Sequence, residues 1–304
     1  MIRFALRRLG LAALVALLVS AASFALIFVA GDPAVALAGQ SGRGQDAEYL
    51  RTLYGLDRPW VIQYADWTWR ALRGDFGRSL YFNLPVGAIL WERVPVTLTL
   101  GCTALGFGLL LAVPLGIAAA MRPDSWIDRG ALFLAVVGQA IPGFWLGLIL
   151  IIVFGMRLGW VPISGTEEWR GYILPTVVLG YYVMPSLMRI LRTGMIEVLG
   201  TDYIRAARAK GLLGPRVILV HALRNAALPL VSLAAVQFGV LLSGSIVIES
   251  VFALNGVGRL AWESILRSDL PVVQSIVLVF SLSYVLLTLA ADLVNAWLDP
   301  RLRA

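Results

Sequence analysis

Few residues in this chain could perform chemistry, and their number excludes several kinds of site. The 304 residues include a single cysteine, Cys102, and a single histidine, His221. They therefore supply neither a disulfide framework nor the several soft ligands of a protein-only metal site. The Gly-x-x-x-x-Gly-Lys-[Ser/Thr] loop that cradles nucleotide phosphates is absent from the sequence. We expect no metal, no cofactor and no ATP hydrolysis in this chain.

Serine and glutamate lie near one another in the segments IESVF (residues 248–252) and AWESIL (residues 261–266). The only histidine lies elsewhere, in a polar segment, so a Ser-His-Asp arrangement would have to form there. The sequence therefore predicts no catalytic residues. A membrane enzyme stays only as an alternative function.

The polar segment, residues 189–229, separates two apolar stretches. Thr201 and Asp202 can cap the start of a helix, the residues after them favour helix, and Gly211 stands where a glycine commonly ends one. The Gly214-Pro215 pair then reopens a helix with proline in its first turn. This pattern predicts a short exposed helix, a break and a second helix.

The run DYIRAARAKG (residues 202–211), followed by HALRNAALP (residues 221–229), resembles the cytoplasmic "EAA" loop of ABC importer permease subunits. Within that family it resembles the dipeptide, oligopeptide and nickel branch, whose loop docks into a groove on a separate ATPase subunit. Small alanines let another surface approach closely, and a glycine lets the chain turn sharply. The resemblance implies that the ATPase-coupling residues are Glu197, Asp202, Tyr203, Arg205, Ala206, Ala207, Lys210 and Gly211.

The resemblance extends over nearly the whole chain. The segments GDFGRSLYFNLPV (residues 74–86) and ERVPVTLTL (residues 92–100) are similar to the same branch at the same places in the chain. In the first of them, Asp75, Arg78 and Asn83 serve either turn chemistry or contact with a partner.

The composition is that of a polytopic membrane protein. Hydrophobic residues make up 59% of the chain, the mean hydropathy is +0.83, and only 14% of the residues are charged, which excludes an ordinary globular protein. The net charge is +7, but the basic residues are spread over loops. No basic domain is present to hold a polyanion, so we expect no nucleic-acid partner.

Six apolar stretches are long enough to cross a bilayer at 1.5 Å per residue. The first, Leu9–Ala30, is longer than the apolar region of a cleaved signal peptide and favours a retained anchor helix. Pro114, Pro142 and Pro185 lie in or near spans and can kink them. The other five expected spans are Val96–Met121, Ala131–Met156, Tyr172–Met188, Ala227–Ile248 and Val272–Leu298.

Basic residues in the short loops predict the orientation. One side holds Arg3, Arg7, Arg8, Arg122, Arg129, the basic residues between Arg189 and Arg224, Arg301 and Arg303. The opposite short loops hold Arg157, Arg170, Arg259 and Arg267. By the positive-inside rule the first side is cytoplasmic. We expect a multi-pass protein of the bacterial inner membrane with both termini in the cytoplasm.

The middle thirds of the expected spans contain no Asp, Glu, Lys, Arg or His, and their longest polar side chains are Gln139 and Gln237. Ion-coupled carriers commonly need ionisable groups at depth, so energy enters elsewhere. A secondary carrier and a channel subunit therefore stay as alternatives only. Gly106 and Gly108 favour close helix–helix packing over direct substrate contact.

We divide the chain into three parts. Residues 1–30 form the cytoplasmic N-terminal end and the first span. Residues 31–95 form an extracytoplasmic segment with helical pieces at Asp46–Tyr54 and Asp57–Leu72. Residues 96–304 form the permease core, with five spans and the coupling loop 189–226.

These observations predict an all-α polytopic membrane protein with six transmembrane helices. The resemblance implies the type I ABC importer fold and a permease subunit that forms the pathway for peptides or related small solutes, with nickel as a further candidate. It also implies the partners, which are a second homologous permease, two ABC ATPase subunits, an extracytoplasmic binding protein and the lipid bilayer.

Overall fold

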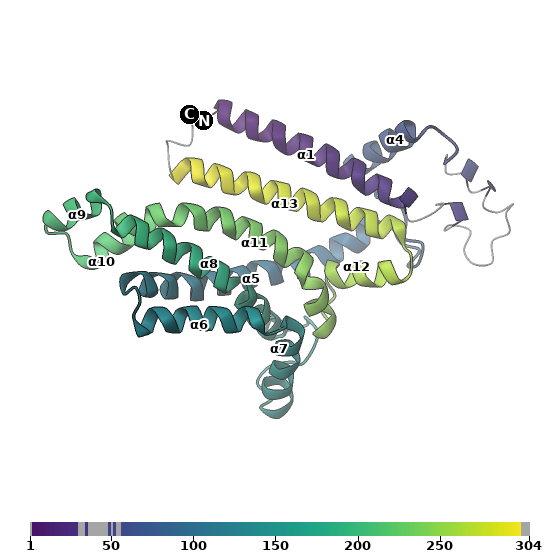
Figure 1. Cartoon of the computed structure of the whole chain (residues 1–304). Coiled ribbons are helices and arrows are strands. Elements are labelled where there is room, and N and C mark those ends of the chain that lie inside the picture. Colours follow the sequence, from purple (N-terminus) through teal and green to yellow (C-terminus); the bar gives the residue numbers. More distant parts are fainter. Residues whose placement is uncertain (1, 30–33, 36–47, 50, 53–55, 299–304) are drawn as a thin grey trace.

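The computed structural model describes the chain except residues 1, 30–33, 36–47, 50, 53–55 and 299–304. Long helices dominate the described part, and one isolated bridge joins Arg78 to Pro85 (Figure 1). The predicted end of the first span at Ala30, much of the predicted helix Asp46–Tyr54, and the C-terminal Arg301 and Arg303 lie outside the described residues.

Five described helices are long and apolar enough to cross a membrane. They are α1 (Ile2–Val29), α5 (Val86–Met121), α8 (Ile173–Leu199), α11 (Leu223–Val251) and α13 (Leu270–Leu298). A sixth span is formed if α6 (Trp126–Ala140) is counted with α7 (Gly143–Leu150) and its π-helical continuation η1 (Ile151–Arg157). This arrangement confirms the predicted all-α polytopic fold.

The predicted straight span Ala131–Met156 is wrong, because α6 and α7 meet at 95°. The bend lies at Ile141-Pro142, just before α7 begins. A proline lacks a backbone N–H and pushes the residue before it out of the helical region, which explains why the bend forms here. The predicted kink at Pro142 is confirmed, whereas Pro114 and Pro185 lie inside the continuous helices α5 and α8.

Helices α5 and α8 extend furthest past their predicted ends. Helix α5 begins at Val86, so residues 86–95, expected in the extracytoplasmic segment, are part of this long helix. Helix α8 continues to Leu199, so residues 189–199 of the predicted loop are helical. The reason is an apolar face that continues past the first arginine, since Leu191 and Met195 are fully buried at helical spacing.

The core depends on close contact between α5 and α8. A Cβ atom added to Gly180 would lie 2.6 Å from the carbonyl oxygen of Ala104, and one added to Gly108 would lie 3.0 Å from the carbonyl oxygen of Gly180. The two backbones therefore touch, as small residues allow in membrane helices. The packing role expected of Gly108 is confirmed. The same expectation is wrong for Gly106, which has nothing within 4 Å of a Cβ position.

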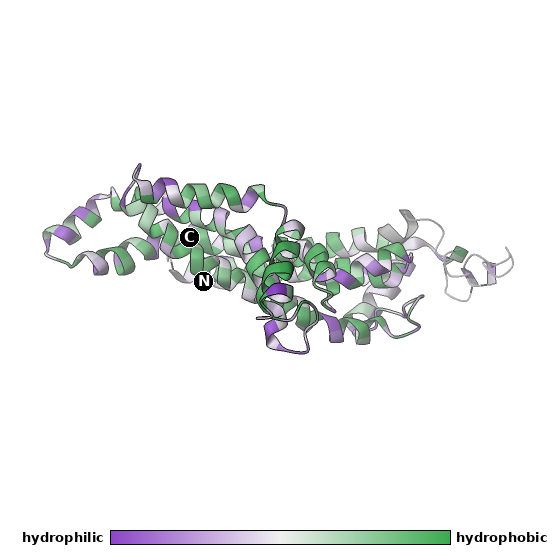
Figure 2. Cartoon of the chain, turned by 90° about the horizontal axis from the view of Figure 1, so that it is seen from below, coloured by the Kyte–Doolittle hydropathy of each residue, from purple (hydrophilic) through white to green (hydrophobic). Residues whose placement is uncertain are grey.

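The long helices form a bundle with two different ends (Figure 1). What we call the α9 end holds the start of α1, the end of α13, the turn between α5 and α6, and the short helices α9 (Asp202–Ala209) and α10 (Gly214–Arg216). What we call the α12 end holds α4 (Trp60–Leu72) and α12 (Val257–Leu266). Hydrophobic residues concentrate along the long helices between these ends (Figure 2).

Two buried carboxylates organise the α12 end. Glu249, at 0% exposure, accepts a hydrogen bond from the hydroxyl of Thr97 at 2.8 Å and from the backbone N–H of Arg259 at 2.9 Å. It thus satisfies a free N–H in the first turn of α12. Asp269 accepts hydrogen bonds from the hydroxyl of Ser79 and, at 3.1 Å, from the backbone N–H of Leu80. The two carboxylates fix α12 and residues 79–81 to the bundle.

Turn chemistry is the role that the structure gives to the polar side chains before α5. The carboxylate of Asp75 accepts the backbone N–H of Gly77 at 3.0 Å, and the Arg78 guanidinium donates to the backbone carbonyl of Asn83 at 2.9 Å. Asn83 itself adopts a positive φ of 54°.

The glycine contact predicts a specific loss of stability. We expect Gly180→Ala to lower the free energy of unfolding by about 2 kcal/mol, because the new methyl group meets the Ala104 backbone. Gly106→Ala is the matched control and should be neutral or stabilising, since alanine favours helix by about 1 kcal/mol over glycine. Detergent-induced unfolding of the purified protein measures both values. Equal losses in the two variants would contradict the contact.

Candidate ATPase-coupling site

Helix α9 begins and ends where the sequence predicts, although its start is built differently. Thr201 precedes the helix, but its hydroxyl donates to the carbonyl of Val198 at 2.6 Å and makes no cap to α9. The predicted side-chain cap is therefore wrong. Asp202 forms an ion pair of 3.1 Å with Arg205. Both of these side chains are exposed, so the pair contributes little stability.

The underside of α9 is anchored in the protein core. Ile204 is fully buried, and Ala207 is half-buried against the same apolar cluster. The hydroxyl of Tyr203 donates to the carbonyl of His221 at 3.3 Å and accepts from the side-chain amide of Asn225 at 2.8 Å. The two parts of the predicted motif, residues 202–211 and 221–229, are thereby brought together.

The face of α9 that points away from the core is exposed. Ala206, Arg205 and Lys210 are exposed, and so is Glu197 in the last turn of α8. The predicted residues thus divide into two groups. Tyr203 and Ala207 hold the helix in place, whereas the others offer a surface. Sequence spacing alone did not separate Ala206 from Ala207, because that separation depends on which side of α9 faces the core.

Gly211 ends the helical turn in a left-handed conformation, with a φ of +77°. Its N–H donates to the carbonyl of Arg208 at 2.9 Å. A Cβ atom at this position would meet nothing within 4 Å. Glycine is needed here for backbone geometry and not for space.

An ion pair that the sequence did not reveal links α6 to α8 near this site. The Arg192 guanidinium donates to both carboxylate oxygens of Asp128 at 2.6 Å, and Asp128 is only 2% exposed. The backbone N–H of Asp124 adds a third hydrogen bond at 2.9 Å. Bidentate, charge-assisted bonds of this kind are strong and directional. They position the part of α8 that leads directly into α9.

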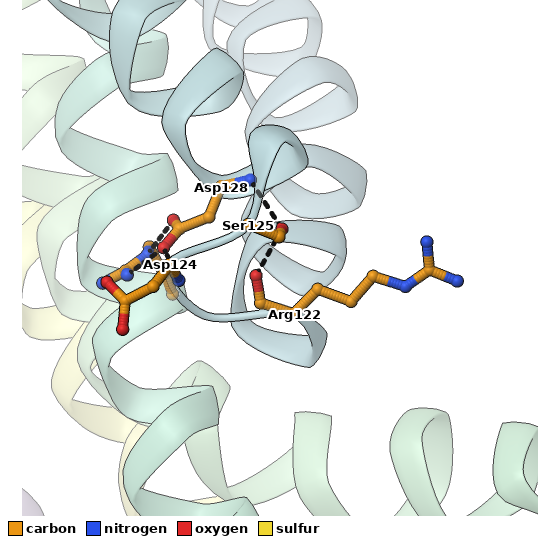
Figure 3. Close-up of polar contacts among 5 residues, drawn as sticks. Arg122, Asp124, Ser125 and Asp128 are labelled. Carbon is orange, nitrogen blue, oxygen red and sulfur yellow. Dashed lines mark hydrogen bonds and ion pairs between the residues drawn. The ribbon is translucent and has the colours of Figure 1, made fainter.

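The turn that presents Asp128 is itself ordered by hydrogen bonds (Figure 3). The Ser125 hydroxyl accepts the N–H of Asp128 at 3.4 Å and donates to the carbonyl of Arg122 at 2.6 Å. The ion pair escaped sequence reasoning because its members lie 64 residues apart. The signal in the sequence was an acidic residue, Asp128, in the first turn of a mainly apolar helix.

The structure separates the residues that could form a hydrolytic site. His221 lies in the π-helical segment η3 (Val217–Ala222) at the α9 end, whereas both Ser/Glu segments lie at the α12 end (Figure 1). Neither of these two segments therefore brings its serine to His221. Among the described residues, no group of three or more His, Cys, Asp or Glu could hold a metal ion.

Comparison with known protein families shows what kind of protein carries this exposed, core-anchored helix. Residues 112–304 match the sequence model described as "Binding-protein-dependent transport system inner membrane component", and residues 1–101 match the model of the corresponding N-terminal region. The chain belongs to this family. It is thus a membrane-spanning permease subunit of an ABC importer, and its family is one of transporter permeases.

Curated relatives match this permease over its full length. The "Glutathione transport system permease protein GsiC" of Salmonella choleraesuis (strain SC-B67) is 39% identical and covers 100% of this chain and 99% of its own. A "Putative peptide transport system permease protein" of Brucella abortus (strain 2308) is 37% identical and covers 98% of both chains.

Two solved transporter structures have a fold similar to that of this permease. An inward-facing structure of the MetNI methionine ABC transporter has a TM-score of 0.58 and 20% identity, and it covers 69% of this permease and 96% of that chain. A second crystal form of MetNI gives a TM-score of 0.55. At this identity the likeness shows the fold alone.

The Asp128–Arg192 pair can be tested by a double-mutant cycle. We expect Asp128→Ala and Arg192→Ala each to lower the free energy of unfolding by about 3 kcal/mol, because each leaves a charge without its partner. The double variant should lose much less than the sum of the two. Unfolding in mixed micelles measures the three values, and strictly additive losses would contradict the pair.

Proposed function

We propose that this permease forms the translocation pathway for peptides or related small solutes such as glutathione, delivered by an extracytoplasmic binding protein. The observation that carries the proposal is the exposed, core-anchored helix α9 in a chain that matches peptide and glutathione permeases over its full length. Nickel stays a candidate of the wider branch, and the names of these relatives favour organic solutes.

Helix α9 is attached to its neighbours in such a way that a displacement of α9 would displace them too. Its eight residues span about 12 Å. Ile204 and Ala207 fix it to the core, and Tyr203 ties it to the start of α11. A surface that docks on Ala206 and moves would therefore move the ends of α8 and α11 with it. We assign the docked surfaces to two ABC ATPase subunits, one on this chain and one on a second homologous permease.

The α9 end faces the cytoplasm in this proposal, since it holds basic residues of the short loops, including Arg122, Arg129, Arg205, Arg208 and Lys210. The chain then lies in the bacterial inner membrane with both termini in the cytoplasm. Residues 56–85 and 250–271 face outward at the α12 end, where they meet the binding protein. The Arg8–Asp292 ion pair of 2.8 Å, which joins the start of α1 to the end of α13, supports the placement of both termini on one side.

Substitutions in and after α9 test the coupling role. We expect Ala206→Trp to abolish ATPase docking by bulk on an exposed face, with membrane insertion and protein level unchanged. Gly211→Val should weaken docking because a β-branched residue disfavours a left-handed backbone by on the order of 1 kcal/mol or more. Co-purification of the ATPase subunits and substrate uptake measure both effects.

Gly211→Asn is the matched control, because asparagine tolerates the left-handed conformation and the site has room for a side chain. It should retain more docking and uptake than Gly211→Val. Ala207→Trp should also fail, but with lower stability, since Ala207 packs on the core. Normal docking in both Ala206→Trp and Gly211→Val at matched expression would show that α9 is not the coupling element.

Photo-crosslinking tests the assignment of the outer face. A benzoylphenylalanine at Ile265, an exposed residue of α12, should capture the binding protein, because the α12 end is proposed to dock it. The same probe at Arg208 of α9 should not. A third probe at Ile163, between η1 and α8, provides the contrast. Capture at Ile163 alone would mean that the wrong surface has been assigned.

A further inference from the structure

Helix α8 carries a polar stripe along one face. The spacing of four, three, four and four residues places its members on that single face. The opposite face is apolar and closed, since Leu187 and Leu191 are fully buried. Tyr182 is 50% exposed, and the other members are exposed or half-buried. The stripe consists of Tyr182, Ser186, Arg189, Thr193 and Glu197.

Both long polar side chains of the neighbouring spans meet this stripe. Gln139 of α6 places its side-chain oxygen 3.1 Å from each terminal nitrogen of Arg189 and accepts both hydrogen bonds. Gln237 of α11 donates a hydrogen bond to the hydroxyl of Ser186. Three helices thus place polar groups around one turn of α8, within otherwise apolar segments.

This polar turn lies deep in the bundle. Trp126 begins α6, is 86% exposed and lies beside Arg129, as is typical of a residue at the membrane–water interface. Gln139 follows Trp126 by thirteen residues of helix, or about 20 Å. The hydrocarbon core of a bilayer is about 30 Å thick. The Arg189 guanidinium, bound to Gln139, therefore lies at a depth where lipid would surround an outward-facing side chain.

The charge of Arg189 has no counter-ion in the part of the chain that the structure describes. The nearby carboxylate of Asp128 is already held bidentately by Arg192. The partner of Arg189, Gln139, is neutral and exposed. Because a charged group facing hydrocarbon is strongly disfavoured, intramembrane charges border water or protein. The face that carries Arg189 and Gln139 therefore does not face lipid.

We propose that the stripe from Tyr182 to Thr193 lines the translocation pathway, with Glu197 at its end belonging to the coupling surface, and that Arg189 binds a carboxylate of the passing solute. This inference rests on the proposed function, since peptides and glutathione carry carboxylates. The guanidinium fork matches a carboxylate in shape and charge. Gln139 orients the fork without neutralising it, which leaves the charge available to the solute. A carboxylate of the second permease is the competing partner, and the experiment separates the two.

Cysteine labelling in the intact importer tests the pathway without knowledge of the solute. In a Cys102→Ser background, Tyr182→Cys and Thr193→Cys should react with two membrane-impermeant methanethiosulfonates, one anionic (sulfonatoethyl) and one cationic (trimethylammonioethyl). Leu110→Cys is the matched control. Leu110 is 70% exposed on α5 at a depth similar to that of Tyr182, since a Cβ at nearby Gly108 would lie 2.8 Å from Val183. It should not react.

Arg189→Gln should then lower the ratio of anionic to cationic labelling rates at Thr193→Cys by about tenfold. The reason is that the nearby positive charge attracts the anionic reagent and repels the cationic one, and the substitution removes both effects. Arg189→Lys should keep the ratio. Unlabelled stripe cysteines, labelling equal to that of Leu110→Cys, or an unchanged ratio in Arg189→Gln would each overturn the assignment.

Uptake of tri-alanine and of its C-terminal amide tests the carboxylate contact. Arg189→Gln should raise the apparent KM for tri-alanine about tenfold and leave that for the amide unchanged. Dissociation of the two permeases in Arg189→Gln, restored by Arg189→Lys, would instead assign the charge to an ion pair between subunits and overturn the proposal. If the unsubstituted importer takes up neither peptide, the proposed function fails for peptides, while the labelling ratio still decides the role of Arg189.

Discussion

The backbone contact between α5 and α8 is the constraint on which the rest of the structure depends. At Gly108 and Gly180 the helices approach so closely that no Cβ atom fits between them. In a bilayer, where the hydrophobic effect does not drive helices together, such close packing is a main source of association. It holds α8 in the middle of the bundle, and α8 in turn leads into α9 and carries the polar groups that face α6 and α11.

A charged side chain near or within a membrane span needs a partner or water, and the charged residues of α8 meet this need in two different ways. Asp128 and Arg192 satisfy one another, and the surrounding turn supplies further hydrogen bonds, so this pair is structural. Arg189, less than one turn away on the same helix, has only a neutral amide as its partner. The difference in pairing, and not the difference in residue type, separates an element of the scaffold from a group available to a solute.

Buried carboxylates at the α12 end have a different role again. Glu249 and Asp269 accept backbone N–H groups and hydroxyls, and each joins segments that lie far apart in the chain. Glu249 of the segment IESVF, where serine and glutamate lie close together in the sequence, is thus a structural carboxylate. These contacts anchor the α12 end to the bundle, while α12 side chains such as Ile265 are exposed on its surface.

Hydropathy, composition and the demand for a positive φ are local properties, so the class of protein, the apolar stretches and the position of α9 and Gly211 were predictable from the residues alone. The sequence also implied the family through motifs at fixed spacing. Only the tertiary structure decided that α6 and α7 meet at 95°, that Ala207 faces the core while Ala206 does not, and that Gln139 reaches Arg189. The place of the bend follows locally from Pro142, but its angle and the other two contacts depend on how helices pack together in space, and a single sequence does not encode that packing in any local pattern.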